Sequence, residues 1–180
     1  MAERYSIKIA GLERQLTKYA VSDTLDIAAF ILFGDTEITI KASEELLKKV
    51  PEFDYIVTPE AKSIPLAYEM ARQSGKPYLV IRKGKKVYMG KNPLEVSVKS
   101  ITTAATQKLY LGEEDVLAIK GKRVLIVDDV ISTGESLVAA QEIVRKAGGN
   151  IVASAAVLAE GDASERDDII FLEPLPLFFK

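Results

Sequence analysis

The residues best suited to chemistry lie in one continuous segment, residues 124–137. An apolar run is followed by two adjacent acids, Asp128 and Asp129, and then by a short loop that ends where a helical pattern begins at Leu137. Hydroxyl groups, a glycine that lets the backbone approach closely and a helix N-terminus together form a cradle of N–H groups that suits a phosphate. The residues of this loop are Ser132, Thr133, Gly134, Glu135 and Ser136.

Two carboxylates beside an anion cradle would repel a phosphate unless they contact another part of the same ligand. A sugar-phosphate removes this conflict. Asp128 and Asp129 could accept hydrogen bonds from ribose hydroxyls, support a magnesium-loaded ligand and stabilise positive charge on the ring carbon. The structural alternative is a solvated strand end followed by a helix cap at Ser132. The spacing of the whole segment favours the functional interpretation, and the chain contains neither G-x-x-x-x-G-K-[ST] nor G-x-G-x-x-G.

The composition narrows the possible chemistry. The 180 residues include no His, Cys or Trp, which excludes a Ser-His-Asp triad, a Cys-His pair, a zinc finger and an iron–sulfur cluster. A formal net charge of -2 argues against a nucleic-acid partner. The longest apolar run, residues 27–33, is too short to span a membrane, and the N-terminus does not begin a signal peptide. We therefore expect a cytoplasmic protein with no membrane partner.

The elements that must position these residues follow an α/β pattern. Short apolar runs predict strands, and amphipathic stretches between them predict helices. The strands are expected at 55–57, 78–81, 123–127 and 151–158, and the helices at 64–74 and 137–147. Continuous apolar strands that alternate with helices indicate a mostly parallel sheet with helices on both faces. The length fits a single domain over residues 1–180, with its core at 53–160.

The rest of the chain departs from this pattern. In the N-terminal arm, residues 1–50, alternation predicts a strand at 5–9 and a hairpin or strand pair within 26–40, and Ser43 is placed to cap a helix that ends before Pro51. Residues 83–121 form a long polar insertion without a strong period, which is typical of an active-site lid or an antiparallel arm. The apolar residues near the C-terminus, 175–179, require a partner surface.

Residues 124–137 resemble the binding motif for 5-phosphoribosyl 1-pyrophosphate (PRPP) of the type I phosphoribosyltransferases, with apolar residues, two acids and a Thr/Gly-containing loop in this order. The resemblance implies that Asp128 and Asp129 hold the ribose hydroxyls and that residues 132–136 hold the 5′-phosphate. Glu135 stands where Gly is commoner, but its backbone N–H can still serve. The resemblance also implies Mg²⁺ bound mainly through PRPP, with no metal site built from the protein alone.

The resemblance extends most closely toward adenine phosphoribosyltransferases. Residues 58–67 are similar to their pyrophosphate loop, with Lys62 in place of Arg and Ser63 in place of Gly, and residues 75–83 are similar to the next strand and its Arg-Lys pair. The implied pyrophosphate-binding residues are Ala61, Lys62, Ser63, Arg82 and Lys83. Positive charge there would stabilise a leaving pyrophosphate. The alternative for the basic cluster, which continues through Lys85 and Lys86, is a solvated turn.

Two features depart from that subfamily. Residues 93–112 align with its flexible loop, but no acid lies between Val96 and Gly112 to protonate a purine. Three threonines of this loop could position phosphates or a base, or belong to a mobile lid: Thr102, Thr103 and Thr106. The N-terminal hood region, residues 5–35, lacks the Phe-Pro-x-Pro-Gly-Ile element. Ile131 and Leu158 are candidates for packing on the base, with ordinary core packing as the alternative.

The resemblance implies a phosphoribosyltransferase of purine salvage that joins a purine base, adenine first, to PRPP and releases pyrophosphate. The family's habit of pairing sites across an interface implies a homodimer. An alternative is a PRPP-binding regulator that has lost catalysis, because the loop acid is missing and the pyrophosphate loop is altered. A magnesium-binding phosphoacceptor domain built on Asp128 and Asp129 is a third possibility, but it leaves residues 132–136 unexplained.

Overall fold

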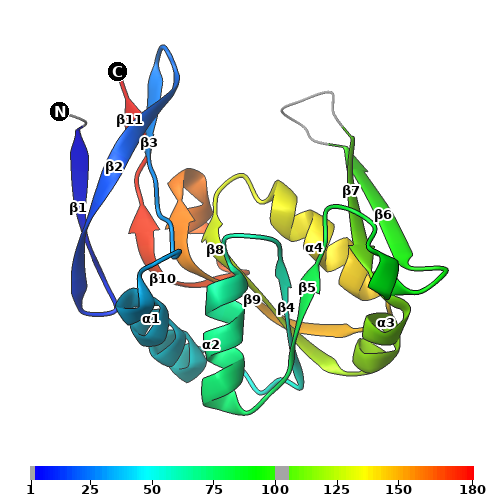
Figure 1. Cartoon of the computed structure of the whole chain (residues 1–180). Coiled ribbons are helices and arrows are strands. Elements are labelled where there is room, and N and C mark those ends of the chain that lie inside the picture. Colours follow the sequence, from blue (N-terminus) through cyan, green and yellow to red (C-terminus); the bar gives the residue numbers. More distant parts are fainter. Residues whose placement is uncertain (1–2, 100–105) are drawn as a thin grey trace.

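The central feature of the computed structural model, which describes residues 3–99 and 106–180, is a parallel sheet of five strands in the order β10-β9-β8-β4-β5. Figure 1 shows α1 and α2 on one face of this sheet and α3 and α4 on the other. The predicted mostly parallel α/β sheet with helices on both faces is confirmed. The strands are β4 (Tyr55–Pro59), β5 (Tyr78–Ile81), β8 (Arg123–Ile131), β9 (Asn150–Glu160) and β10 (Ile170–Leu175), and the helices are α1 (Thr36–Lys49), α2 (Ile64–Ser74), α3 (Glu113–Ile119) and α4 (Glu135–Lys146).

The core explains why β8 reads as a continuous apolar run. Leu125 and Val127 belong to one buried cluster with α1 and α2, whereas Val124 and Ile126 belong to a second cluster with α4. All four side chains are at most 1% exposed. Because successive side chains of a strand point to opposite faces, a strand covered on both faces must be apolar at every position. The helix predicted at 64–74 is confirmed and ends at Gly75, whose φ of 68° gives the left-handed C-cap that favours glycine.

A second, antiparallel sheet lies beside the core and is called the hood sheet below. Its strands are β1 (Arg4–Ile9), β2 (Leu12–Ser22), β3 (Leu25–Ala28) and β11 (Phe178–Phe179), in that order. The strand predicted at residues 5–9 is confirmed. The C-terminal apolar residues find the partner surface that they require, because Phe178 pairs with Asp26 in β3 and its ring packs edge-on against Tyr5 at 5.1 Å between centroids.

The strand pair predicted within residues 26–40 is wrong for residues 37–40, which form the first turn of α1. Asp35 caps this helix by accepting a hydrogen bond from the Ile38 N–H, and Arg14 of β2 holds the Asp35 carboxylate at 2.6 Å. Ser43 is therefore inside the helix and fully buried, and its hydroxyl donates to the Thr39 carbonyl at 2.7 Å. Four residues that alternate in polarity fit a strand and also fit one turn of a helix. The helical spacing of the buried residues becomes visible only when residues 38–46 are considered together.

The polar insertion contains a short 3₁₀ turn, η1 (Val87–Met89), and an antiparallel hairpin of β6 (Leu94–Lys99) and β7 (Thr106–Leu111). This confirms the antiparallel arm. The hairpin is anchored because Val96, Leu109 and Leu111 are buried in the cluster of α4. Thr102 and Thr103 lie outside the described residues, and Thr106 begins β7. Figure 1 shows the hood sheet and the hairpin on opposite sides of the loop between β8 and α4. Within the part of the chain that the structure describes, no helix is long and apolar enough to cross a membrane.

Candidate functional site

The two acids lie on β8 near its carboxyl end. The strand does not stop at Val127 as predicted, because Asp128 pairs with Ala156 and the pairing with β9 continues to Ile131. Asp128 is partly buried and Asp129 is only 3% exposed. The Asp128 carboxylate accepts a hydrogen bond from the Asp129 N–H at 2.9 Å. The carboxylates are therefore fixed to a buried strand at the edge of the sheet where ligands of α/β folds bind.

Burial and the neighbouring acid change the ionisation of Asp128. Burial, a hydrogen bond with Asp129 and the negative charge of Asp129 together raise the pKa of Asp128 to about 8, against the opposing effect of Lys62. Lys62 Nζ lies 2.9 Å from Oδ2 of Asp129, at an angle that does not make a hydrogen bond within the described structure. This buried oxygen can therefore accept a further hydrogen bond or a cation. A ligand that brings a hydroxyl or a metal ion would relieve the repulsion between the two acids.

The loop predicted to hold a phosphate, residues 132–136, is called the phosphate loop below. Its residues Ser132, Thr133, Gly134 and Ser136 line a cavity of about 100 Å³ together with Asp128. Gly134 is the N-cap of α4 with φ 83° and has no side chain to cap this helix end, and the Thr133 hydroxyl lies 3.5 Å from the Glu135 N–H, from which it accepts a hydrogen bond. The helix begins at Glu135, two positions earlier than predicted from Leu137. The backbone N–H groups of its first turn, together with the hydroxyls of Ser132, Thr133 and Ser136, surround a space that suits an anion. The structure thus brings four of the five predicted phosphate residues and Asp128 to one cavity, and Glu135 is not among the residues that line it.

The loop predicted to bind pyrophosphate, called the pyrophosphate loop below, connects β4 to α2, and its three predicted residues differ in exposure. Ala61 and Lys62 are exposed, and Lys62 reaches Asp129. Ser63 is buried, and its hydroxyl donates to the Pro59 carbonyl at 2.9 Å and lies 2.7 Å from the Thr58 hydroxyl. Lys62 is therefore available to a ligand, while the Ser63 side chain holds the loop in shape.

Arg82 and Lys83 follow β5, beside the pyrophosphate loop. Glu60 accepts a hydrogen bond from Arg82 Nε at 2.7 Å and another from the Lys83 N–H. Burial opposes the ionisation of Glu60, but these donors outweigh it and hold its pKa below the ordinary value. Arg82 also donates to the Tyr88 hydroxyl. Sequence reasoning missed Glu60. An acid within residues 58–67, which were predicted to bind an anion, was a signal that this acid pairs with a cation of the protein, here Arg82.

A second cavity, of about 280 Å³, lies between the hood sheet and the site. Residues 27–31 form one wall, and Lys62, Val130, Ser132, Glu160 and Leu175 form the rest. Because Ser132 also lines the phosphate cavity, the two cavities adjoin. Sequence reasoning missed this wall, although residues 27–31 are part of the longest apolar run. Leu158, predicted to pack on a base, is 0% exposed and belongs to the core cluster.

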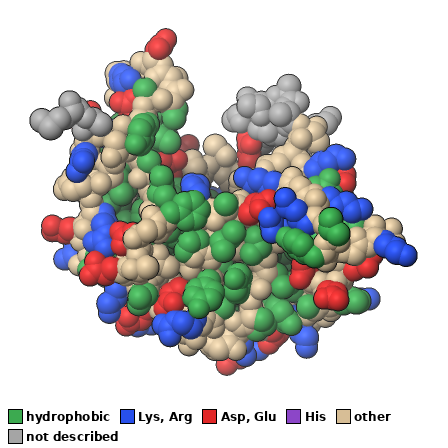
Figure 2. All heavy atoms as spheres, viewed as in Figure 1, with side chains coloured by type: hydrophobic (Ala, Val, Ile, Leu, Met, Phe, Trp, Pro, Cys, Tyr) green, Lys and Arg blue, Asp and Glu red, His purple; other side chains and the backbone are tan. Residues whose placement is uncertain are grey.

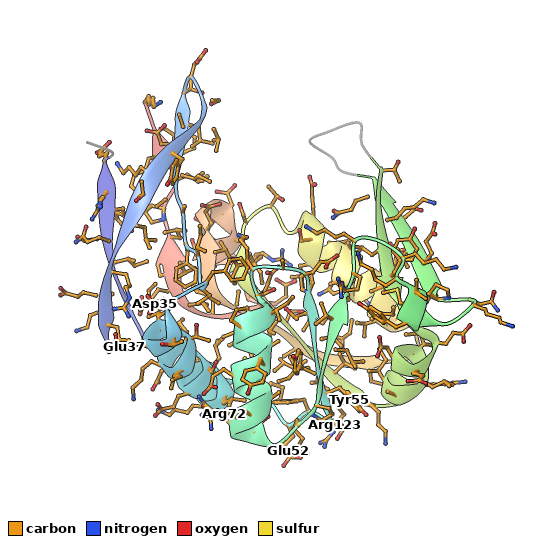
Figure 3. All side chains as sticks on the ribbon, viewed as in Figure 1. Asp35, Glu37, Glu52, Tyr55, Arg72 and Arg123 are labelled. Carbon is orange, nitrogen blue, oxygen red and sulfur yellow. The ribbon has the colours of Figure 1, made fainter. Side chains whose placement is uncertain are left out.

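The surface supports this location for the site. Figure 2 shows a hollow between the hood sheet and the hairpin, with Lys and Arg side chains gathered on the hairpin side. A larger cavity of about 440 Å³ lies at the opposite edge of the sheet. It is lined by the cations Lys76 and Arg123, and Arg123 is paired with Glu52 and Asp54. Figure 3 places Arg123 and Glu52 together at that edge, away from the loop after β8. Among the described residues, no cluster of three or more acids, His or Cys could hold a metal ion alone.

With this geometry established, comparison with known proteins identifies the family. The family model of the phosphoribosyl transferase domain matches residues 34–174, which is more than half of the chain. The chain belongs to the phosphoribosyltransferase family. Among its relatives, the hypoxanthine/guanine phosphoribosyltransferase of Methanocella arvoryzae is 31% identical over 147 residues, which cover 82% of this chain and 70% of the relative.

Other relatives carry both purine names. The hypoxanthine/guanine phosphoribosyltransferase of Methanococcus voltae is 39% identical over 63% of this chain and 56% of its own length, and the adenine phosphoribosyltransferase of Thermotoga petrophila is 37% identical over 58% of each. The chain thus spans little more than half of these two curated relatives. Adenine phosphoribosyltransferase from Saccharomyces cerevisiae, solved with adenine, has the same fold, with a TM-score of 0.68, 23% identity and coverage of 88% of this chain and 92% of that chain. The type I phosphoribosyltransferase fold is confirmed.

Proposed function

We propose that this protein is a magnesium-dependent purine phosphoribosyltransferase that joins adenine to PRPP and releases pyrophosphate, as in purine salvage. The observation that carries the proposal is that three groups lie at one sheet edge: the acidic pair on β8, the N-terminus of α4 at Gly134, which lines one cavity with Asp128, and Lys62, whose Nζ lies 2.9 Å from Asp129. An anion cradle, hydrogen-bond acceptors for a sugar and a cation for a second phosphate group together match the parts of PRPP.

The reaction that fits this arrangement is substitution at the anomeric carbon of the ribose. The bond from that carbon to the pyrophosphate oxygen breaks with its electron pair leaving on pyrophosphate, and a ring nitrogen of the base forms the new bond. Asp128 and Asp129 hold the ribose hydroxyls and stabilise the positive charge of the transition state. The phosphate loop holds the 5′-phosphate, and Lys62, Arg82 and Lys83 stabilise the leaving pyrophosphate.

Mg²⁺ fits these residues as a cation that comes with PRPP. Mg²⁺ is bound in proteins through one or two carboxylates together with substrate phosphates, and the buried Oδ2 of Asp129 is an oxygen ligand of the kind it prefers. Bound there, Mg²⁺ would neutralise charge on the pyrophosphate. Asp128 and Asp129 would be the residues that hold it, and their repulsion would fall when it binds.

The base would lie in the cavity between the hood sheet and Ser132. Its walls are mostly apolar, as purine sites require, and its ionisable groups are Lys62 and Glu160. Adenine is the base that we propose, because the relatives include the adenine phosphoribosyltransferase of Thermotoga petrophila, and the adenine phosphoribosyltransferase of Saccharomyces cerevisiae shares the fold. Val130, near the end of β8, would separate the base from the ribose site. Ile131, which lines the phosphate cavity, and Leu158, which lies in the core, would pack behind the base site.

The experiment that tests this proposal measures pyrophosphate release in the presence of PRPP, Mg²⁺ and each of adenine, hypoxanthine and guanine. We expect release that depends on all three components and is fastest with adenine. Pyrophosphate release with guanine or hypoxanthine but not with adenine would overturn the choice of adenine, while the reaction would still be phosphoribosyl transfer. The Arg72→Gln variant is a suitable control, because Arg72 lies on α2 in a pair with Glu69 and away from the site.

A second candidate function is a PRPP-binding regulator without catalysis. The absence of an acid between Val96 and Gly112 favours it, because that segment then offers no carboxyl group to protonate a departing or attacking base. The same assay separates the two functions. Saturable PRPP binding without pyrophosphate release for any base would support the regulator and exclude the transferase.

We also propose that the protein is a cytoplasmic homodimer without nucleic-acid or membrane partners. Large apolar side chains are exposed on α1, α2 and the segment before α1, with Phe33 56% and Tyr68 55% exposed. Figure 2 shows hydrophobic side chains gathered over this region. A second copy would remove such a patch from water. Light scattering should give twice the mass of the chain, and Phe33→Ser with Tyr68→Ser should shift the mass to that of one chain.

A further inference from the structure

Arg166 lies against the phosphate loop although it is far from that loop in the sequence. It follows a 3₁₀ turn, η2 (Gly161–Glu165), which comes directly after β9. Because β9 pairs with β8 in parallel, the segments that follow the two strands leave the sheet at the same edge. The guanidinium nitrogen Nη1 lies 2.7 Å from the point that a Cβ atom on Gly134 would occupy. A cation thus stands within contact of the backbone that forms the N-cap of α4.

The guanidinium is held in a fixed direction by Asp168. Arg166 Nε donates to one carboxylate oxygen of Asp168 at 2.8 Å, and Nη2 donates to the other at 2.7 Å. The Arg166 side chain is 30% exposed, whereas that of Asp168 is 59% exposed. A bidentate pair of this kind fixes the plane of the guanidinium. The nitrogen that faces Gly134 is the one that the pair does not use.

Gly134 provides the space for this approach. Its φ of 83° already disfavours other residues, and a side chain there would also displace the guanidinium. The same residue lines the phosphate cavity and precedes the first turn of α4. A partly exposed ion pair between residues two positions apart adds little to stability. The arrangement therefore places a fixed positive charge against Gly134, which lines the phosphate cavity, although Arg166 itself is not among the lining residues.

We propose that Arg166 binds the 5′-phosphate of the sugar from outside the phosphate loop and makes the site selective for a phosphorylated ribose, with Asp168 as its positioning residue. This inference rests on the proposed function, because it assumes that residues 132–136 hold that phosphate. Arginine suits the role because its planar donors match phosphate oxygens and its charge is permanent. The helix dipole and Arg166 then act on the same doubly charged group.

The test measures binding by calorimetry in the presence of Mg²⁺ for three probes: PRPP, ribose 5-phosphate and pyrophosphate. Arg166→Gln should weaken the binding of PRPP and ribose 5-phosphate about 10- to 100-fold, which is the range of a hydrogen bond between charged groups, and leave pyrophosphate unchanged. Arg166→Lys should restore part of the loss, and Asp168→Asn should give a smaller loss. In turnover, Arg166→Gln should raise KM for PRPP with little change in kcat.

The matched control is Arg72→Gln, because Arg72 makes an equivalent bidentate pair with Glu69 on α2, with donors at 2.9 and 2.7 Å. It should change the binding of none of the three probes. Unchanged binding of ribose 5-phosphate to Arg166→Gln would overturn the inference, and so would an equal loss for pyrophosphate, since that would indicate a general structural role. Failure of the unaltered protein to bind PRPP or ribose 5-phosphate would instead overturn the proposed function and this inference with it.

Discussion

Asp128→Asn should make the protein more stable at pH 8 while it removes the proposed activity. In the unfolded chain, Asp128 loses its proton near its ordinary pKa of 3.8, whereas in the folded protein burial and Asp129 raise that pKa to about 8. Between these values the folded state binds more protons than the unfolded state. The free energy of unfolding therefore falls as the pH rises through this window, and the penalty is complete above pH 8.

The magnitude follows from the same pKa shift. At about 1.4 kcal/mol for each pKa unit, a shift from 3.8 to about 8 corresponds to at most about 6 kcal/mol. Asp128 is only partly buried, so water and nearby groups reduce this cost, and we expect a gain of about 2–4 kcal/mol for the variant at pH 8. Asparagine is nearly the same shape as aspartate and keeps an oxygen that can accept the Asp129 N–H hydrogen bond.

The assay is urea unfolding of the protein and of Asp128→Asn at several pH values from 4.5 to 8.5. The difference between the two free energies of unfolding should be smallest at the acidic end and should grow toward pH 8. Asp168→Asn is the control, because Asp168 is exposed and its hydrogen bond with Arg166 lowers its pKa, so that its titration ends below this window. A difference that stays constant with pH would refute the reasoning about the acidic pair.

Three further predictions follow from the loops. Gly134→Ala should lower the free energy of unfolding by about 1–2 kcal/mol in urea titrations, because φ is positive at this position. It should also weaken PRPP binding. An unchanged free energy of unfolding together with unchanged PRPP binding would contradict the described N-cap. Lys62→Met should weaken pyrophosphate binding about tenfold or more by calorimetry, with Lys76→Met as an unaffected control. Ser63→Ala should cost about 1–2 kcal/mol of stability, because the Pro59 carbonyl loses its buried donor, but should leave pyrophosphate affinity unchanged; a selective loss of affinity would assign Ser63 to the ligand instead.

The α/β core could be predicted because its signals are local. Buried parallel strands are apolar at every position, so β4, β5 and β9 appear as short runs between amphipathic helices, and Gly75 marks the end of α2. The acidic pair and the phosphate loop could also be predicted, since one strand, its loop and the next helix carry them all. The helical first turn at residues 37–40 could not, because it depends on a cap at Asp35 that Arg14 of β2 holds in place.

The rest of the site depends on contacts between segments that are distant in the sequence. Glu60 is recognisable as the residue that holds Arg82 only when the ends of β4 and β5 are placed side by side. Arg166 meets Gly134 only because β8 and β9 are neighbours. The cavity walled by residues 27–31 requires the hood sheet to stand beside the core. No spacing within one segment encodes these contacts, and they are the contacts through which the site can discriminate among ligands.

The measurement that tests the central claim most directly is the formation of a nucleoside monophosphate and pyrophosphate from PRPP, adenine and Mg²⁺ by the unaltered protein and by the double variant Asp128→Asn, Asp129→Asn. We predict equal amounts of the two products from the unaltered protein and a loss of at least about 100-fold in the double variant, in keeping with the removal of groups that stabilise a transition state. Undiminished product formation by a folded double variant would contradict the role assigned to the acidic pair.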